Sequence, residues 1–333
     1  MTERRLSLLL LLVLLALTGW ALTLGTAPLT PSMMVAGLLP DLFPHDDPRL
    51  AMVMQEIRLP RVLLGLVVGA ALGLAGAALQ GLLRNPLAEP SIIGTSSCAS
   101  LGAVLAFYYG LAADFSLALP LAGISGAALG TLLLLALAGP AASTLTLILT
   151  GVALSSMAGA LTSLALNLSP SPYAVTEIVM WMMGSLKDRS MDDVLLASPF
   201  VLAGCLLLLR AGRGLDALTL GEEAAASLGI ALPRLRVQVI AGAALAVGAA
   251  VATAGSVGFV GLIIPHLLRP LVGHRPSAVL LPSVLGGAAL LTAADIVVRL
   301  IPARSELMLG VVTAIIGTPF FCTLILKARR QAS

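Results

Sequence analysis

The sequence predicts an all-α integral membrane protein with about ten transmembrane helices. Sixty-two consecutive residues, from Phe115 to Thr176, contain no Asp, Glu, Lys or Arg, and two membrane-spanning helices would fill such a run. Of the 333 residues, 59% are apolar and only 11% are charged, which is far from the composition of a water-soluble domain. The apolar runs are too long and too unpatterned for barrel strands. Helices are therefore the expected spans.

Ten charge-poor stretches define these spans. They follow one another with mostly short loops, so we expect a single transmembrane domain that covers residues 1–333. In chain order the spans are Leu6–Leu24, Val62–Leu83, Pro90–Ala113, Phe115–Ala138, Ser143–Leu168, Val194–Leu209, Val237–Ala254, Gly258–Leu271, Ala278–Leu300 and Leu307–Leu326.

The charges predict how the chain is oriented. An even number of spans places both termini on one side, and the basic ends make that side cytoplasmic by the positive-inside rule. The alternating pattern places 12 of the 19 Lys and Arg there. A cleaved signal peptide is the other interpretation of the first segment, although its apolar run exceeds the usual length of about 7–15 residues. The basic residues at the two ends are Arg4, Arg5, Lys327, Arg329 and Arg330.

No cofactor or metal is expected on this chain. Cys98, Cys205 and Cys322 fall in predicted spans that are far apart in the sequence, which argues against a disulfide framework or a metal cluster. His266 is a lone histidine in an apolar segment, and such a residue more often packs or forms a hydrogen bond than binds haem.

A stripe of glycines marks one face of the second span. Gly65, Gly69 and Gly73 recur every four residues, a spacing that places them on one side of a helix and lets another helix approach closely. Close helix packing is the expected role, and this pattern alone says nothing about cargo.

The residues around this stripe carry a specific resemblance. Arg58-Leu59-Pro60-Arg61 precedes it, and QGLLRNPLAEP at 80–90 and IGTSS at 93–97 follow it. The stretch 58–102 resembles, almost position by position, the permease subunits of ABC importers for iron chelates, haem and vitamin B12. Three further blocks resemble the same family: IVMWMMGSL at 178–186, GSVGFVGLIIPH at 255–266, and Glu306 with GVVTAIIGTPFF at 310–321.

The resemblance covers nearly the whole chain and implies a type II ABC importer permease architecture. It implies a homodimer, two ABC ATPase subunits on the inside and a periplasmic or lipid-anchored substrate-binding protein on the outside. The chain would lie in the lipid of the bacterial cytoplasmic (inner) membrane and bind no nucleic acid. The expected cargo is an iron chelate, either a ferric siderophore or haem, and cobalamin is the alternative.

ATP hydrolysis is expected on a separate subunit. A phosphate-binding loop needs Gly followed by Lys and a hydroxyl residue. The chain has only two lysines, Lys187 and Lys327, and no Gly-Lys dipeptide. The permease therefore makes no covalent bond, and ATP is used by its partner.

The contact for the ATPase is expected in the long cytoplasmic loop 212–236. Helix formers there end at a glycine, which indicates at least a short amphipathic helix. In the resembling family this loop supplies the coupling helices that fit a cleft of the nucleotide-binding subunit. The residues expected to serve this role are Leu220, Gly221, Glu222, Ala225, Leu228 and Gly229.

Three arginines are expected at the outer water boundary. Arg58 and Arg61 flank the start of the second span, and Arg299 ends the ninth. By resemblance they would receive acidic residues of the binding protein, since guanidinium binds carboxylate in a bidentate manner. The alternative is that they are snorkelling membrane anchors. Asp295 lies four residues before Arg299, a spacing that allows an ion pair within one helix.

The translocation path is indicated more weakly. By resemblance, Ser143, Thr144 and Thr146 form the cytoplasmic gate. Met182 and Met183 offer soft side chains that could line a passage for a bulky chelate, although ordinary packing explains them equally well. A secondary transporter and an intramembrane enzyme are the other classes. Both are disfavoured, because buried ionisable residues are scarce and no catalytic motif is present.

Overall fold

The computed structural model describes residues 2–25, 29–43, 49–111, 115, 117–139, 142–169, 171–301 and 306–332. These residues form helices and no β-strand. Seven helices are long and apolar enough to cross a membrane, and three shorter apolar helices complete a set of ten. Each of the ten coincides with one predicted span. The all-α prediction of about ten spans is therefore confirmed.

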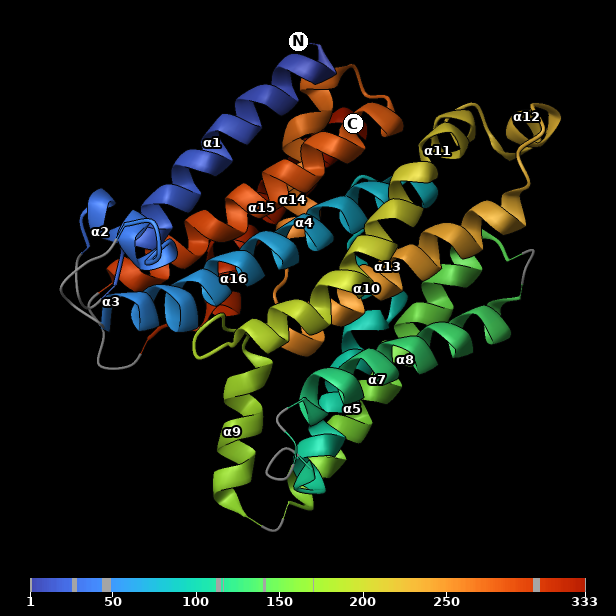
Figure 1. The fold of residues 1–333 in the computed structure, drawn as a ribbon. Helices are drawn as coiled ribbons and strands as arrows, with labels where there is room; N and C mark the ends of the chain where they lie inside the picture. Colours follow the sequence, from blue (N-terminus) through green and yellow to red (C-terminus); the bar gives the residue numbers. More distant parts are fainter. Residues whose placement is uncertain are drawn as a thin grey trace.

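The helices are named as in Figure 1. The seven long ones are α1 (Glu3–Thr23), α4 (Leu59–Leu82), α7 (Ala118–Ala138), α8 (Thr144–Asn167), α10 (Met191–Arg210), α13 (Leu232–Ala254) and α15 (Pro276–Leu300). The shorter apolar ones are α5 (Thr95–Tyr108), α14 (Val260–Leu268), which a 3₁₀ turn at Arg269–Val272 continues, and α16 (Leu309–Ala332), which is apolar over 309–324.

Several short elements lie between the spans. They are α2 (Pro31–Leu38), α3 (Arg49–Met52), a π-helical turn at Val53–Arg58, a 3₁₀ turn at Pro90–Ile93, α9 (Pro172–Met182), α11 (Gly212–Leu218) and α12 (Glu222–Ser227). Helix α9 lies in a segment that we expected to be a loop. Its start has local causes: the side chain of Ser171 accepts a hydrogen bond from the Tyr173 N–H at 3.3 Å, and Pro172 is its first residue.

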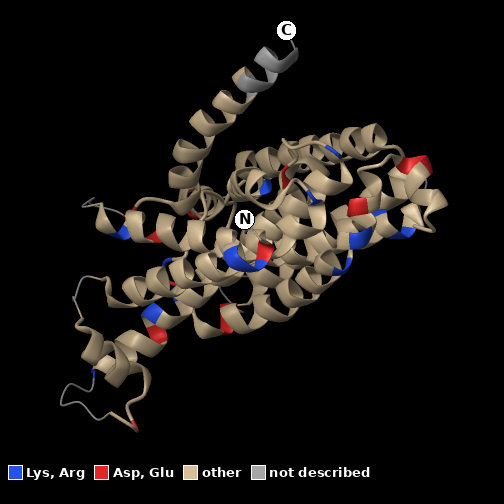
Figure 2. Cartoon of the chain, turned by 90° about the horizontal axis from the view of Figure 1, so that it is seen from above, with Lys and Arg blue, Asp and Glu red and all other residues tan. Residues whose placement is uncertain are grey.

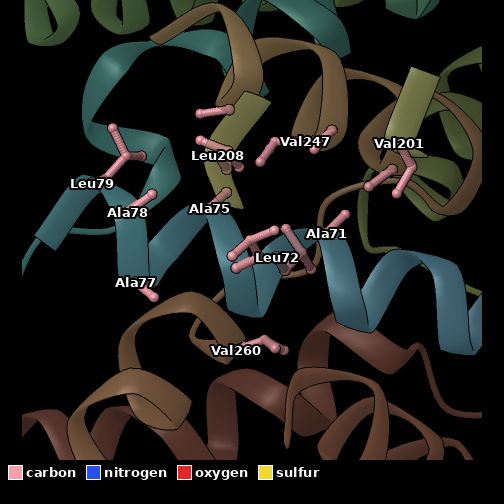
Figure 3. Close-up of a cluster of buried hydrophobic side chains, with 14 of the residues drawn as sticks. Ala71, Leu72, Ala75, Ala77, Ala78, Leu79, Val201, Leu208, Val247 and Val260 are labelled. Atoms are coloured by element: carbon pink, nitrogen blue, oxygen red, sulfur yellow. The ribbon is translucent and has the colours of Figure 1, made fainter. Parts of the chain in front are cut away.

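Helix α4 is the centre of the bundle. It runs between α15 and α10 in Figure 1, and nearly all of its residues from Val68 to Leu82 are buried. Figure 3 shows Ala71, Leu72 and Ala75 of α4 among apolar side chains of α10, α13 and α14. Because alanine and glycine dominate this helix, its neighbours can approach its backbone closely.

The glycine stripe lies where α4 meets α15. A Cβ placed on Gly69 would come within 2.5 Å of the Gly287 carbonyl oxygen, and one on Gly73 would overlap the Ser283 carbonyl. Gly65 faces a side chain instead, with Leu186 Cδ1 at 3.1 Å from such a Cβ. The two helix backbones therefore touch along the middle of the stripe.

The two ends of the bundle carry different elements. In Figure 1 the N-terminus, the C-terminus, α11 and α12 lie toward the upper end, while α2, α3 and α9 lie toward the other. Charged residues are few in Figure 2, and α16 extends away from the other helices there. The side chains of Lys327, Arg329 and Arg330 lie outside the described residues.

Candidate functional site

A cluster of charged residues joins α4, α15 and the segment before α16, at the end of the bundle where α4 begins. Arg61 Nη2 lies 2.8 Å from Asp295 Oδ1, and Arg61 Nε lies 3.0 Å from the same oxygen. The Arg61 guanidinium also pairs with Glu306, which precedes α16. The Asp295 side chain is 4% exposed. This cluster ties α4 to α15 and to the segment before α16.

The other two arginines bind the end of α1. Arg58 Nη1 donates to the carbonyls of Leu22 and Thr23, both at 2.8 Å, and Arg299 Nη1 donates to the Ala21 carbonyl at 2.8 Å. These carbonyls are the unsatisfied acceptors of a helix C-terminus, where cations are favoured. Arg299 Nη2 also lies 2.7 Å from Asp295 Oδ2, so the predicted ion pair within α15 is confirmed.

The three arginine side chains are mostly covered by the protein, which differs from the exposed position that we expected. Arg58 is only 4% exposed. Each of the three binds groups of its own chain, because an unpaired guanidinium would be too costly inside the bundle. Their docking role is not tested by this geometry and stays a prediction. A partner carboxylate would have to compete with Asp295, Glu306 and the α1 carbonyls.

A cavity of about 630 Å³ opens beside this cluster. Sequence reasoning missed the loop that forms its other wall, Lys187 to Ser190. Burial lowers the pKa of Arg189, while the nearby charges of Asp193 and Asp188 oppose this shift. Only the density of charge between α9 and α10 could have indicated this wall. The charged residues that line the cavity are Glu56, Arg58, Arg61, Lys187, Asp188, Arg189, Arg299 and Glu306.

The predicted coupling segment forms α11 and α12 at the opposite end. The two leucines that we expected at the ATPase contact point outward, with Leu220 67% and Leu228 64% exposed, whereas Ala225 is fully buried. Gly221 lies between the two helices with φ +106°, and Gly229 follows α12 with φ +84°. Glycine adopts such positive φ angles without strain. Glu222 pairs with Arg236 Nη2 at 2.8 Å. The loop 212–236 therefore contains two short helices, α11 and α12, in place of the one amphipathic helix that we expected.

Asp216 anchors this segment to the start of α15. Its Oδ1 accepts from the Ser277 N–H at 2.8 Å, its Oδ2 accepts from the Ser277 hydroxyl at 2.6 Å, and Arg275 Nη2 lies 3.1 Å away. Burial opposes ionisation, but these hydrogen bonds and the Arg275 charge outweigh it and lower the pKa of Asp216. Asp216 was not anticipated as part of the site.

An apolar groove of about 710 Å³ runs between α16 and the end of α9. Met182 and Met183 line it together with Phe259 and the first half of α16. Backbone hydrogen bonds join the start of α16 to the residues that follow α9. The Leu309 N–H donates to the Gly184 carbonyl at 2.8 Å, and the Gly310 N–H donates to the Met183 carbonyl at 3.1 Å. Met182 and Met183, which we expected along the translocation path, therefore both line this groove.

The predicted gate residues lie elsewhere. The Ser143 side chain caps α8, accepting from the Thr146 N–H at 3.1 Å, and its hydroxyl lies 2.9 Å from that of Thr146. Ser143, Thr144 and Thr146 are not among the residues that line the groove. Among the described residues, no group of three or more His, Cys, Asp and Glu could hold a metal ion.

Comparison with known proteins places the chain in a family. The model of the FecCD transport family matches residues 8–327. The hemin transport system permease protein HmuU of Yersinia pestis is 36% identical, over 84% of each chain. The vitamin B12 import system permease protein BtuC of Escherichia coli O9:H4 is 42% identical, over 85% of this chain and 86% of that one.

A solved structure shares the fold as well. A metal-chelate type ABC transporter in an inward-facing conformation matches with a TM-score of 0.84 and 33% identity, over 98% of this chain and 100% of the other. The arrangement of ten apolar helices is therefore one that this class of transporter adopts. The chain belongs to the FecCD transport family and is an ABC transporter permease.

Proposed function

We propose that this chain is the permease subunit of an ATP-driven importer that moves an iron chelate, a ferric siderophore or haem, across the bacterial inner membrane. The observation that carries the proposal is the family match over residues 8–327. Two similar proteins, HmuU and the transporter of solved structure, are named for hemin and for metal chelates. The apolar groove with Met182 and Met183 suits a bulky ligand.

The permease acts with partners. Two copies form a homodimer around a shared passage, two ATPase subunits bind α11 and α12 from the cytoplasm, and a periplasmic or lipid-anchored binding protein docks over Arg58, Arg61 and Arg299. Both termini lie in the cytoplasm. ATP is hydrolysed by the partner, and this chain needs no cofactor. Closure of the ATPases shifts the permease between outward-open and inward-open packings.

Helix α16 supports the homodimer. Ile315 is 67% and Ile316 47% exposed on it, and Figure 2 shows α16 away from the other helices. The same helix forms one wall of the groove. A second copy of α16 would cover these side chains and close the groove into a path between the protomers.

Uptake by the complete transporter in proteoliposomes tests the proposal. Hemin, ferric dicitrate and cyanocobalamin serve as probes, with ATP inside the vesicles and an uncoupler as control. We expect uptake of an iron probe that requires ATP and survives the uncoupler. Uptake of cyanocobalamin alone would favour the vitamin B12 alternative, which the 42% identity to BtuC supports. Uptake that the uncoupler abolishes while ATP remains would contradict an ATP-driven importer.

A further inference from the structure

Phe259 has an unusual backbone for an aromatic residue. It stands immediately before α14 with φ +69° and ψ −22°, in the left-handed region. Side chains other than glycine rarely adopt this conformation, because the Cβ atom crowds the following carbonyl. Such a conformation persists only where the surroundings hold it, and it is often found at functional positions.

Glu89 is the group that holds it. Glu89 Oε1 accepts a hydrogen bond from the Phe259 N–H at 2.6 Å, across 170 positions of the sequence. A carboxylate is favoured there, because the N–H groups at the start of α14 are the positive end of the helix dipole. Glu89 belongs to the connection between α4 and α5, so this bond joins that connection to the groove.

The start of α14 is otherwise fixed to α4. A Cβ on Gly76 would overlap the backbone of Gly261. Gln80, in the last turn of α4, donates to the Gly261 carbonyl at 3.3 Å and accepts from Arg269 Nη2 at 2.8 Å. Gln80 is 2% exposed. Helix α14 and α4 therefore form one rigid unit, and Phe259 stands at its edge.

The Phe259 side chain reaches from this unit to α16. Its ring lies against Gly317, where even a Cβ atom would overlap the ring carbons. One turn further, His266 and Phe320 meet edge to face with ring centres 5.7 Å apart. Phe259 is also part of the groove wall. The orientation of this ring therefore decides how α16 is seated and how wide the groove is.

We propose that Glu89 is a positioning residue that holds Phe259 on Gly317, so that movement of the α4–α5 connection is passed to α16 and to the groove wall. This inference rests on the proposed function, because it assigns Phe259 to the path of the cargo. Release of the N–H lets the backbone return to negative φ, which turns the Cα–Cβ bond and lifts the ring from Gly317. The positive and negative φ of Phe259 are two discrete backbone states, and coupling between the α4–α5 connection and α16 requires an element of this kind.

Four variants of the complete transporter test the inference in proteoliposomes with the three probes above. Glu89→Gln keeps an oxygen that can accept the Phe259 N–H, whereas Glu89→Leu does not. Phe259→Gly keeps the positive φ without strain and removes only the ring. Glu177→Leu changes an exposed carboxylate on α9 and serves as the matched control. A polarity-sensitive fluorophore on Ile315→Cys, with the native cysteines replaced, reports the seating of α16.

We expect uptake to fall at least tenfold in Glu89→Leu and in Phe259→Gly, with a shift of the fluorophore emission, and to stay within threefold in Glu89→Gln and Glu177→Leu. Phe259→Gly removes the ring but also relieves the strained φ, so we expect it to fold and to test the inference even if Glu89→Leu does not fold. Uptake within twofold of wild type in Phe259→Gly, or equal loss in Glu89→Gln and Glu89→Leu, would overturn the inference. No uptake by the wild type would instead refute the proposed function.

Discussion

Arg61 and Asp295 are 234 positions apart in the sequence and form a doubly bonded ion pair, with Arg61 Nη2 2.8 Å and Arg61 Nε 3.0 Å from Asp295 Oδ1. The pair is almost fully buried, and Asp295 also binds Arg299. It joins the start of α4 to the end of α15, the two helices whose glycines touch in the middle of the bundle. The pair therefore fixes the register of α4 against α15.

Asp295→Asn is expected to destabilise the permease strongly. It removes the carboxylate that Arg61 and Arg299 share, so that Arg61 keeps only Glu306, and breaking one partner of a buried pair costs about 3–5 kcal/mol. Thermal unfolding in detergent is the measurement, with the exposed Asp192→Asn as control. A loss equal to that of the control would show that the pair is dispensable. Charge reversal at Arg61 should lower stability too, so docking must be measured on folded protein.

Gly69→Ala and Gly73→Ala are expected to disturb the contact of α4 with α15. Each adds a Cβ where the Gly287 or Ser283 backbone lies, and overpacking costs about 1–3 kcal/mol. Gly159→Ala in α8 is the matched control, because nothing lies within 4 Å of its added Cβ. The amount of folded protein in the membrane and its unfolding temperature report the effect. Normal abundance of both α4 variants would contradict close packing.

Leu220→Glu and Leu228→Glu are expected to weaken binding of the ATPase subunit about tenfold each, which corresponds to roughly 1.4 kcal/mol. Both side chains are mostly exposed, so the unfolding temperature should not change. Leu42 is similarly exposed in the segment that follows α2, so Leu42→Glu should leave ATPase binding intact. If the three variants bind the ATPase equally well, α12 and its flanks are not the coupling surface.

Acid is expected to loosen α11 from α15 through Asp216. Its folded-state pKa is below the ordinary value of 3.8, so the bonds to Ser277 and Arg275 add stability above that value, and this stability is lost as the pH falls through the lower folded-state pKa. Hydrogen exchange of the Ser277 amide reports the contact. Wild type and Asp216→Asn should differ at neutral pH and converge as the pH falls through the folded-state pKa, which lies below 3.8. A difference that does not depend on pH would exclude the carboxylate as the cause.

Cys322 offers a test of the homodimer without a new side chain. It is exposed on α16, the helix that we place beside the axis, so a short bifunctional maleimide should link two wild-type copies in the membrane. Cys322→Ser should abolish the link, since Cys98 is buried and Cys205 is only partly accessible. Efficient linking in Cys322→Ser would show that a surface other than α16 lies at the homodimer axis.

The sequence by itself determined the membrane setting and the ten spans, because long charge-free runs have no other stable environment. It also determined the pair of Asp295 and Arg299, which one helical turn brings together. Local spacing could not show Arg61 as their third partner. Nor could it show α9, whose 11 residues are too few to span a bilayer.

Only the tertiary structure decided which helices touch and which residues they hold in place. The glycine stripe predicted a close approach on α4, but Gly287 and Ser283 became its partners through packing across more than 200 positions. The left-handed Phe259 has no local cause in its sequence, because a phenylalanine does not itself favour positive φ. Its conformation depends on Glu89, from a distant loop. Contacts of this kind arise from long-range packing, which residue patterns within one helix do not encode.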